Sequence, residues 1–446
     1  MLSFSTNIIN KYFIINFLFS SLIISFIAGN LVLNLNIVLI IIASIFFFKK
    51  NIIPFNLDFI DKILIILFSY ILLCSALNNI YYYKDGSVDN FSIFLKSILF
   101  LRFLLFYFIV KFLIKENIIN FKIFFITSFA SVVFVCADII YQLVFGYDIF
   151  GYKAIQRRLS GPFGDELIAG SFIQRFSLFS LFLVPVFFKF KKNYTKYIFT
   201  FALICLFLVS IILSGNRIPL VFFILSIFGI IIFEKKLRKL LLPFTFITVS
   251  IIFLAYNLSE NYRNHLLSFK VKTSQILMPL SSKNLLTAKD EKNYENYKFY
   301  TFEYKGQKYK MTNSHLKEFK TGYMTWLDKK IFGGGIKSFK INCPKAQTTN
   351  CGSHPHNYYL EILSNLGLVG FVIIFILFSL IFFKTFIVKY FKNSNLNNYH
   401  LITPFIFLFF SEVFPIKSTG SFFSTGNATY IFLLLSIIIP LSKVKN

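Results

Sequence analysis

Long apolar stretches separated by short polar segments make up most of this chain. A helix needs about 20 mostly apolar residues to cross a bilayer, and twelve stretches of roughly that length follow one another along the sequence. They cover residues 10–28, 31–48, 60–78, 93–113, 120–145, 168–189, 196–213, 217–233, 238–257, 358–383, 400–417 and 426–442. The pattern predicts an all-α polytopic membrane protein with about 12 transmembrane helices.

Composition excludes the main alternatives to a membrane protein. Of the 446 residues, 56% are hydrophobic and only 15% are charged, whereas about a quarter of a soluble domain is charged. An aromatic content of 20% also excludes an intrinsically disordered chain. The net charge of +27 does not indicate nucleic acid, because the basic residues lie in short clusters between apolar stretches. We therefore expect membrane lipids, and no nucleic acid, as partners.

The basic clusters also predict an orientation. Short cytoplasmic loops of membrane proteins are enriched in Lys and Arg. With a cytoplasmic N-terminus and alternating spans, the inner segments hold 20 Lys and Arg, and the short outer loops hold six. The sequence therefore predicts that both termini are cytoplasmic.

One outer segment is far longer than the rest and divides the chain into three parts. Residues 1–257 carry nine predicted spans, residues 258–355 form a large polar loop, and residues 356–446 carry three more spans. From Asn257 to Pro355 there are 17 Lys and Arg against 7 Asp and Glu. This excess suits an acceptor rich in phosphate or acidic sugar, although a solvated basic surface explains it equally well.

Three local elements and one cross-link are expected within this loop. The elements are a helix over residues 260–277, a hairpin turning at Lys305-Gly306, and a helix from Asn313 or Ser314 to about Lys330. Cys343 and Cys351 are eight residues apart, and an oxidising outer compartment favours a disulfide between them. Two free thiols are the alternative.

Ionisable residues inside predicted spans are costly and mark function by default. They are Lys96, Arg102, Asp138, Arg175, Glu361 and Glu412. The last four fall in the outer halves of their spans, so we expect them to describe a polar cavity that opens outward. Structural ion pairs between helices are the alternative for each of them.

Four outer segments are richer in polar and glycine residues than plain loops. The first, RRLSGPFGDELIAGSFIQR, carries Arg157, Arg158, Asp165, Glu166 and Arg175. In the second, SGNRIP, an arginine opens a helix at the membrane surface, where it can hold a phosphate with two donors or act only as an interfacial anchor. That arginine is Arg217.

The third segment, IFGGGIKSF, could bring the backbone amides of Gly334 and Gly335 close to an anion, although loop flexibility explains it equally well. The fourth, HPHNYYLEILSNLGLVG, places His356 and Asn357 directly before an apolar helix. Histidine is well suited to take a proton from a sugar hydroxyl near neutral pH. An interfacial histidine bonded to backbone is the alternative.

Together these segments resemble the O-antigen ligase and polymerase superfamily. The resemblance rests on RLSGPFGDE, on SGNR opening a helix, and on a long outer loop that ends in GGGIKSF and HPHNYYLEILSNLG. Its most specific part is His356-Asn357, followed after nine intervening residues by Gly367 and then by Gly370. The twelve predicted spans, with the long loop between the ninth and tenth, extend the resemblance over essentially the whole chain.

The resemblance implies a GT-C-like glycosyltransferase in the bacterial inner membrane that takes a glycan from an undecaprenyl-diphosphate carrier at the periplasmic face. A ligase transfers the glycan to a lipid A-core acceptor, and a polymerase transfers it to another carrier-linked repeat. It also implies that Arg217 binds the carrier diphosphate, that His356 is the base, and that a second arginine lies in the long loop. Arg263 is the only arginine there. We expect a ligase, with a polymerase of the same superfamily as the alternative.

The residues themselves suggest the other contacts. Those expected to bind substrate are Arg158, Asp165, Glu166, Arg175, Asn357, Gly334 and Gly335. Neither a cofactor nor a metal is expected, because arginines can screen a leaving diphosphate and no DxD-like or His-rich cluster occurs in the outer segments. A polysaccharide or lipid-glycan transporter is the competing class, but the sequence lacks the internal repeats typical of transporters.

Overall fold

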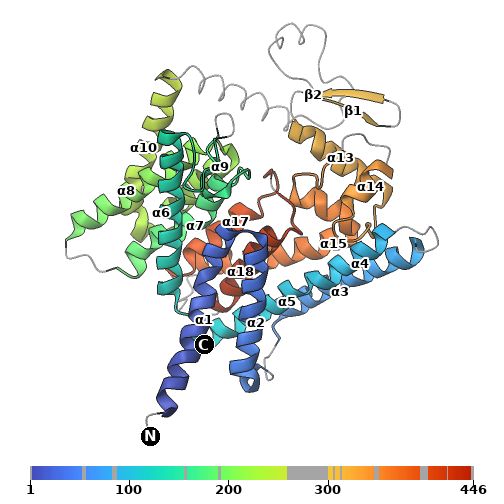
Figure 1. The fold of residues 1–446 in the computed structure, drawn as a ribbon, viewed down its shortest axis with the longest axis horizontal. Coiled ribbons are helices and arrows are strands. Elements are labelled where there is room, and N and C mark those ends of the chain that lie inside the picture. Colours follow the sequence, from blue (N-terminus) through green and yellow to red (C-terminus); the bar gives the residue numbers. More distant parts are fainter. Residues whose placement is uncertain are drawn as a thin grey trace.

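The computed structural model describes residues 3–52, 57–82, 88–154, 158–188, 192–258, 300–304, 307–311, 314–345, 351–391, 400–418 and 420–442. Within these ranges the chain is almost entirely helical (Figure 1). Eight helical segments of the described residues are long and apolar enough to cross a membrane, so the chain is a multi-pass membrane protein. These segments lie in α1 (Ser3–Ala28), α2 (Asn30–Ile52), α3 (Phe59–Tyr82), α4 (Val88–Phe100) with α5 (Arg102–Lys115), α6 (Phe121–Phe145), α7 (Ala169–Val186), α8 (Asn193–Leu213), and α15 (Tyr358–Phe382) with its extension to Phe391.

The remaining predicted spans coincide with four further helices. These are α9 (Arg217–Phe233), α10 (Lys235–Leu258), α17 (Thr403–Glu412) and α18 (Thr425–Leu441). Helix α17 is much shorter than the predicted span over residues 400–417. Its ten residues rise only about 15 Å, half of a bilayer core. The chain leaves the helix at Val413 and turns into the loop that leads to α18.

Helix α18 forms the centre of the bundle. It packs against α2, α5 and α17, and most of its side chains are buried (Figure 1). Phenylalanine rings fill the space around it: Phe432 contacts Phe68, Phe100 and Phe103. Aromatic packing of this kind suits a membrane protein, in which helices associate through van der Waals contact rather than the hydrophobic effect.

Two predicted spans are interrupted. Residues 93–113 fall in α4 and α5, which meet at Leu101, where the amide bonds three residues back to Ile98. Helix α15 is broken at Gly367, whose φ of +67° and ψ of −168° are not helical. The amides of Leu368 and Val369 after the break donate to the carbonyls of Lys330 and Ile331 instead.

The glycine-rich segment explains how this break is accommodated. A Cβ atom at Gly367 would overlap the carbonyl oxygen of Ile331, and one at Gly333 would lie 2.5 Å from the amide of Gly367. Glycine at both positions therefore lets two backbones meet. The amide of Gly335 donates to the carbonyl of Asn365, completing the junction.

The described parts of the long loop contain the hairpin and the second helix that the sequence predicts. Strands β1 (Tyr300–Tyr304) and β2 (Gln307–Met311) form the expected antiparallel hairpin, in which Tyr300 pairs with Met311 and Tyr304 with Gln307. The expected second helix is α13 (Ser314–Asp328), followed by the short α14 (Phe339–Lys345). The helix predicted over residues 260–277 lies outside the described residues.

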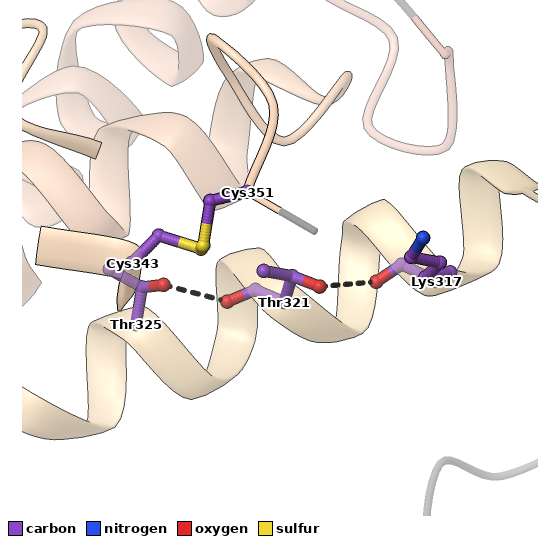
Figure 2. Close-up of a disulfide and its surroundings, with 5 residues drawn as sticks. All are labelled: Lys317, Thr321, Thr325, Cys343 and Cys351. Carbon is purple, nitrogen blue, oxygen red and sulfur yellow. Dashed lines mark hydrogen bonds between the residues drawn. A yellow bond between two sulfur atoms is a disulfide. The ribbon is translucent and has the colours of Figure 1, made fainter. Parts of the chain in front are cut away.

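The predicted disulfide is confirmed. Cys343 and Cys351 are bonded, with their Cα atoms 5.8 Å apart. Figure 2 shows the bond beside Thr321 and Thr325 of α13, whose hydroxyls donate to backbone carbonyls one turn earlier. The disulfide thus fixes the start of the segment that leads to His356.

Candidate active site

A cavity of about 1040 Å³ lies among the loops that connect the helices. Its wall contains the turn between α1 and α2, the RLSGPFGDE segment, the SGNR turn, the HPH segment before α15, and the loop between α17 and α18. Six predicted site residues line it. They are Arg158, Asp165, Glu166, Arg175, Arg217 and His356.

Glycine lets two of these segments pack together. A Cβ atom at Gly170, in the first turn of α7, would lie 2.8 Å from Cβ of Asn216. A Cβ atom at Gly215, whose φ is +69°, would lie 2.9 Å from Cγ of Arg158. The two sequence motifs are therefore in direct contact, with the Arg158 side chain lying across the SGNR turn.

This contact brings two arginines together. Arg158 and Arg217 are close enough to repel each other electrostatically, and both line the cavity. Arg217 is the first residue of α9, and Arg158 comes from the loop before α7. Two neighbouring guanidinium groups offer paired donors to phosphate oxygens, and a bound polyanion would relieve their repulsion.

His356 is held in an unusual backbone conformation. Its φ is +52°, a left-handed value that is uncommon for residues other than glycine. The imidazole is about one-third exposed, with Nε2 3.4 Å from Oε2 of Glu318. The ring of His354 lies beside it, with ring centroids 4.2 Å apart.

Asn357, the next residue, is buried and does not line the cavity. Its Oδ1 accepts hydrogen bonds from the amides of Tyr359 and Leu360, which caps the N-terminus of α15. Its Nδ2 donates to the carbonyls of Pro415, at 2.7 Å, and Lys417, at 3.2 Å. Asn357 thus joins the loop that carries Lys417 to the segment that carries His356.

Arg175 is one member of a buried charge cluster behind the cavity wall. It forms a two-pronged ion pair with Glu412, with Nη2 2.6 Å from Oε1 and Nε 3.2 Å from Oε2. Lys417 pairs with the same carboxylate at 2.9 Å, and the hydroxyl of Tyr358 donates to it. The cluster joins α7, α15, α17 and the following loop, and both cations also line the cavity.

The other intramembrane charges do not line the cavity. Glu361 accepts hydrogen bonds from the hydroxyl of Ser421 and the amide of Phe422, and Asp138 accepts one from the amide of Ile149. Arg102 donates to Asn34. Of the four residues expected to describe the cavity, only Arg175 reaches it. The alternative of a structural ion pair holds for Glu412, whereas Asp138 and Glu361 accept hydrogen bonds from neighbouring loops.

Residues 201–375 match the family model described as O-antigen ligase. Arg217 and His356 both lie within this match. This match supports the O-antigen ligase and polymerase superfamily over that part of the chain. No curated protein matches the chain. Members of the superfamily are membrane glycosyltransferase-like enzymes. The matched region does not include the cavity residues Arg158, Asp165, Glu166, Arg175 and Lys417.

The remaining predicted residues lie elsewhere in this O-antigen ligase-like chain. Gly334 and Gly335 pack against Asn342 and Ile93 at the broken helix and do not line the cavity. Arg157 and Arg263 lie outside the described residues. Within the described ranges, no three His, Cys, Asp or Glu side chains converge in a way that could hold a metal ion.

Sequence reasoning missed Lys417, Phe319, His354 and Asn427, all of which line the cavity. A signal existed for Lys417. Glu412 lies in an apolar stretch and needs a cationic partner, and Lys417 follows it by five residues. No comparable signal pointed to Phe319, because it reaches the cavity from α13, far from the other motifs in sequence.

Proposed function

We propose that this protein is a glycosyltransferase of the ligase type. It transfers a glycan from an undecaprenyl-diphosphate carrier to a lipid A-core acceptor at the periplasmic face of the bacterial inner membrane. The observation that carries the proposal is the convergence of Arg158, Arg217 and His356 on one cavity from three separate segments. A cavity of about 1040 Å³ is at the upper end of the range for small-molecule sites, which suits a glycan.

The reaction needs two kinds of help from the protein. The bond from the anomeric carbon of the glycan to the carrier phosphate breaks, and the same carbon forms a bond to an acceptor hydroxyl oxygen. Arg158 and Arg217 stabilise the negative charge that develops on the departing diphosphate. His356 takes the proton from the acceptor hydroxyl. Two arginines supply the charge screening that a divalent cation supplies in other glycosyltransferases.

The charges and apolar surfaces of the cavity support this reaction. Among the described residues, the cations Arg158, Arg175, Arg217 and Lys417 line it, against the carboxylates Asp165 and Glu166. Arg175 and Lys417 share the carboxylate of Glu412 behind the wall, which leaves the pair Arg158 and Arg217 for a ligand. This excess favours an anionic substrate group. Apolar side chains from α1, α2 and α7 also line the cavity and suit the isoprenoid chain of the carrier. They are Phe26, Leu33, Phe172 and Phe176.

A reconstitution assay tests the proposal. The purified protein in liposomes, given a carrier-linked glycan and a lipid A-core acceptor, is expected to form the joined product and to release the carrier diphosphate. A transporter would move the lipid-linked glycan between leaflets without forming product. Absence of product under these conditions, with lipid movement present, would overturn the proposal in favour of transport.

The polymerase is the second candidate, because the domain match covers ligases and polymerases alike. The banding profile of lipopolysaccharide from a deletion strain separates the two. Loss of all polymer from the core supports the ligase. A single repeat unit remaining on the core supports the polymerase.

A further inference from the structure

Glu318 contacts His356 from a distant part of the chain. It lies in the first half of α13, and its Oε2 is 3.4 Å from Nε2 of the imidazole. The side chains of Glu318 and His356 are 28% and 34% exposed, so neither is fully solvated. A carboxylate at this distance from an imidazole nitrogen favours the protonated form of the ring by charge attraction.

Two features hold α13 and the histidine segment against each other. Gly322, one turn after Glu318, allows close approach, since a Cβ atom there would lie 2.6 Å from Cβ of Pro355. The disulfide between Cys343 and Cys351 fixes the start of the segment beside α13 (Figure 2). The left-handed backbone of His356 is unfavourable for a residue other than glycine, so these contacts must hold the residue where it is.

We infer that Glu318 is the positioning residue for His356, an inference that rests on the proposed function. When His356 takes the proton from the acceptor hydroxyl, the ring becomes a cation. Glu318, whose Oε2 faces Nε2 of the ring, stabilises that cation and favours the ring orientation that keeps Nε2 toward it. The arrangement is analogous in logic to the carboxylate of a Ser-His-Asp triad, which orients its histidine without taking the proton.

The surroundings of His356 make a carboxylate necessary. The ring of His354 lies beside it on the same segment. Lys317 and Lys320 flank Glu318 on α13, and burial lowers the pKa of Lys320. The cavity also contains four cations and the carboxylates Asp165 and Glu166. Because most of these groups are basic, a nearby anion is needed for the imidazole to accept a proton readily.

The experiment compares Glu318→Gln and Glu318→Asp with Asp328→Asn in the purified, reconstituted protein. Asp328 is an exposed residue at the end of the same helix, so its variant removes one carboxylate from α13 without touching His356. We expect Glu318→Gln to slow transfer about tenfold to a hundredfold, less than a buried triad carboxylate would, because Glu318 is partly exposed. Glu318→Asp should retain most of the rate, and Asp328→Asn should match the wild type.

Two further measurements distinguish a role of Glu318 in positioning His356 from a role in folding alone. In Glu318→Gln the acidic limb of the pH–rate profile should move to lower pH by about half a unit, because the imidazolium loses its carboxylate partner. Diethyl pyrocarbonate modifies neutral imidazole, so labelling of His356, located by peptide mass spectrometry, should show the same shift. An unchanged acidic limb and unchanged labelling in Glu318→Gln would overturn the inference even if the rate falls.

The variants distinguish failure of the inference about Glu318 from failure of the proposed function. If His356→Ala retains transfer, the role of His356 as base fails, whatever Glu318 does. If His356→Ala abolishes transfer but Glu318→Gln matches Asp328→Asn in rate, pH profile and labelling, only the inference about Glu318 fails.

Discussion

Arg158 and Arg217 reach one cavity from different loops because Gly215 leaves room for the Arg158 side chain. Either arginine alone would leave part of a diphosphate unscreened. We therefore predict that Arg158→Ala and Arg217→Ala each slow transfer about 10²- to 10³-fold, the usual cost of removing a donor to a developing anion. Arg217→Lys should recover only part of the rate, since an ammonium lacks the planar pair of donors.

The control for these arginine variants is Lys153→Ala, which removes an exposed cation from the same outer segment. Transfer per folded protein is measured in liposomes. A Lys153→Ala rate as low as that of Arg217→Ala would mean that general positive charge, rather than a specific pair of donors, supports the reaction.

Asn357 gives a second prediction at the residue scale. Asn357→Asp keeps the oxygen that caps α15 but loses the two hydrogen bonds donated to the carbonyls of Pro415 and Lys417. Asn357→Ala loses these donated hydrogen bonds and the capping hydrogen bonds as well. We expect Asn357→Ala to lower the free energy of unfolding by about 1 kcal/mol for the cap, with about 1–3 kcal/mol more for the carbonyls left unpaired. Asn357→Asp should lie between wild type and alanine.

Thermal unfolding in detergent measures these effects, and transfer should fall less in Asn357→Ala than in His356→Ala. Equal melting temperatures for Asn357→Ala and the wild type would show that the contacts of Asn357 add nothing to stability.

At the scale of elements, the break in α15 carries the next prediction. Gly367 has a φ of +67°, and any side chain there would overlap the carbonyl of Ile331. Gly367→Ala should therefore destabilise the protein by about 2 kcal/mol or more, through backbone strain and steric overlap together. Gly352→Ala is the matched control, because its nearest neighbouring atom would be 3.7 Å away. Comparable melting temperatures in the two variants would contradict the described junction.

The same elements show what sequence patterns could and could not reveal. Apolar length located the long helices, and turn and capping residues located the hairpin and α13, because all of these depend on local sequence. The break at Gly367 was not predictable from the apolar run that contains it. Its free amides are satisfied by Lys330 and Ile331, which lie more than thirty residues earlier. The glycine run therefore resembled an anion-binding turn, although it packs against a broken helix.

The site residues likewise fall into those that the sequence could identify and those that depend on contacts between distant segments. Arg158, Arg217 and His356 could be selected from sequence because unusual residues cluster in outer segments. Glu318 could not be selected, because its contact with His356 depends on how α13 packs against Pro355. For Lys417 the sequence signalled the pairing with Glu412, but its place in the cavity depends on the early end of α17, which turns its loop toward the cavity.

At the scale of the whole molecule, the orientation in the membrane is the open prediction. Reporter fusions after Lys192 and Lys239 should be cytoplasmic, because these basic loops belong to the inner side under the charge rule. A fusion near Gly306 should be periplasmic. A cytoplasmic signal at Gly306 would contradict both the orientation and a reaction at the periplasmic face.

The central claim is that His356 accepts the proton of the acceptor hydroxyl in a cavity whose arginines bind the departing diphosphate. The most direct test is the single-turnover transfer rate of His356→Ala in liposomes, expressed per folded protein and compared with the wild type. Removal of a general base typically costs about 10²- to 10⁴-fold, and we predict a loss in that range with the melting temperature and membrane insertion preserved. A rate near that of the wild type would contradict the mechanism and leave His356 as an interfacial residue.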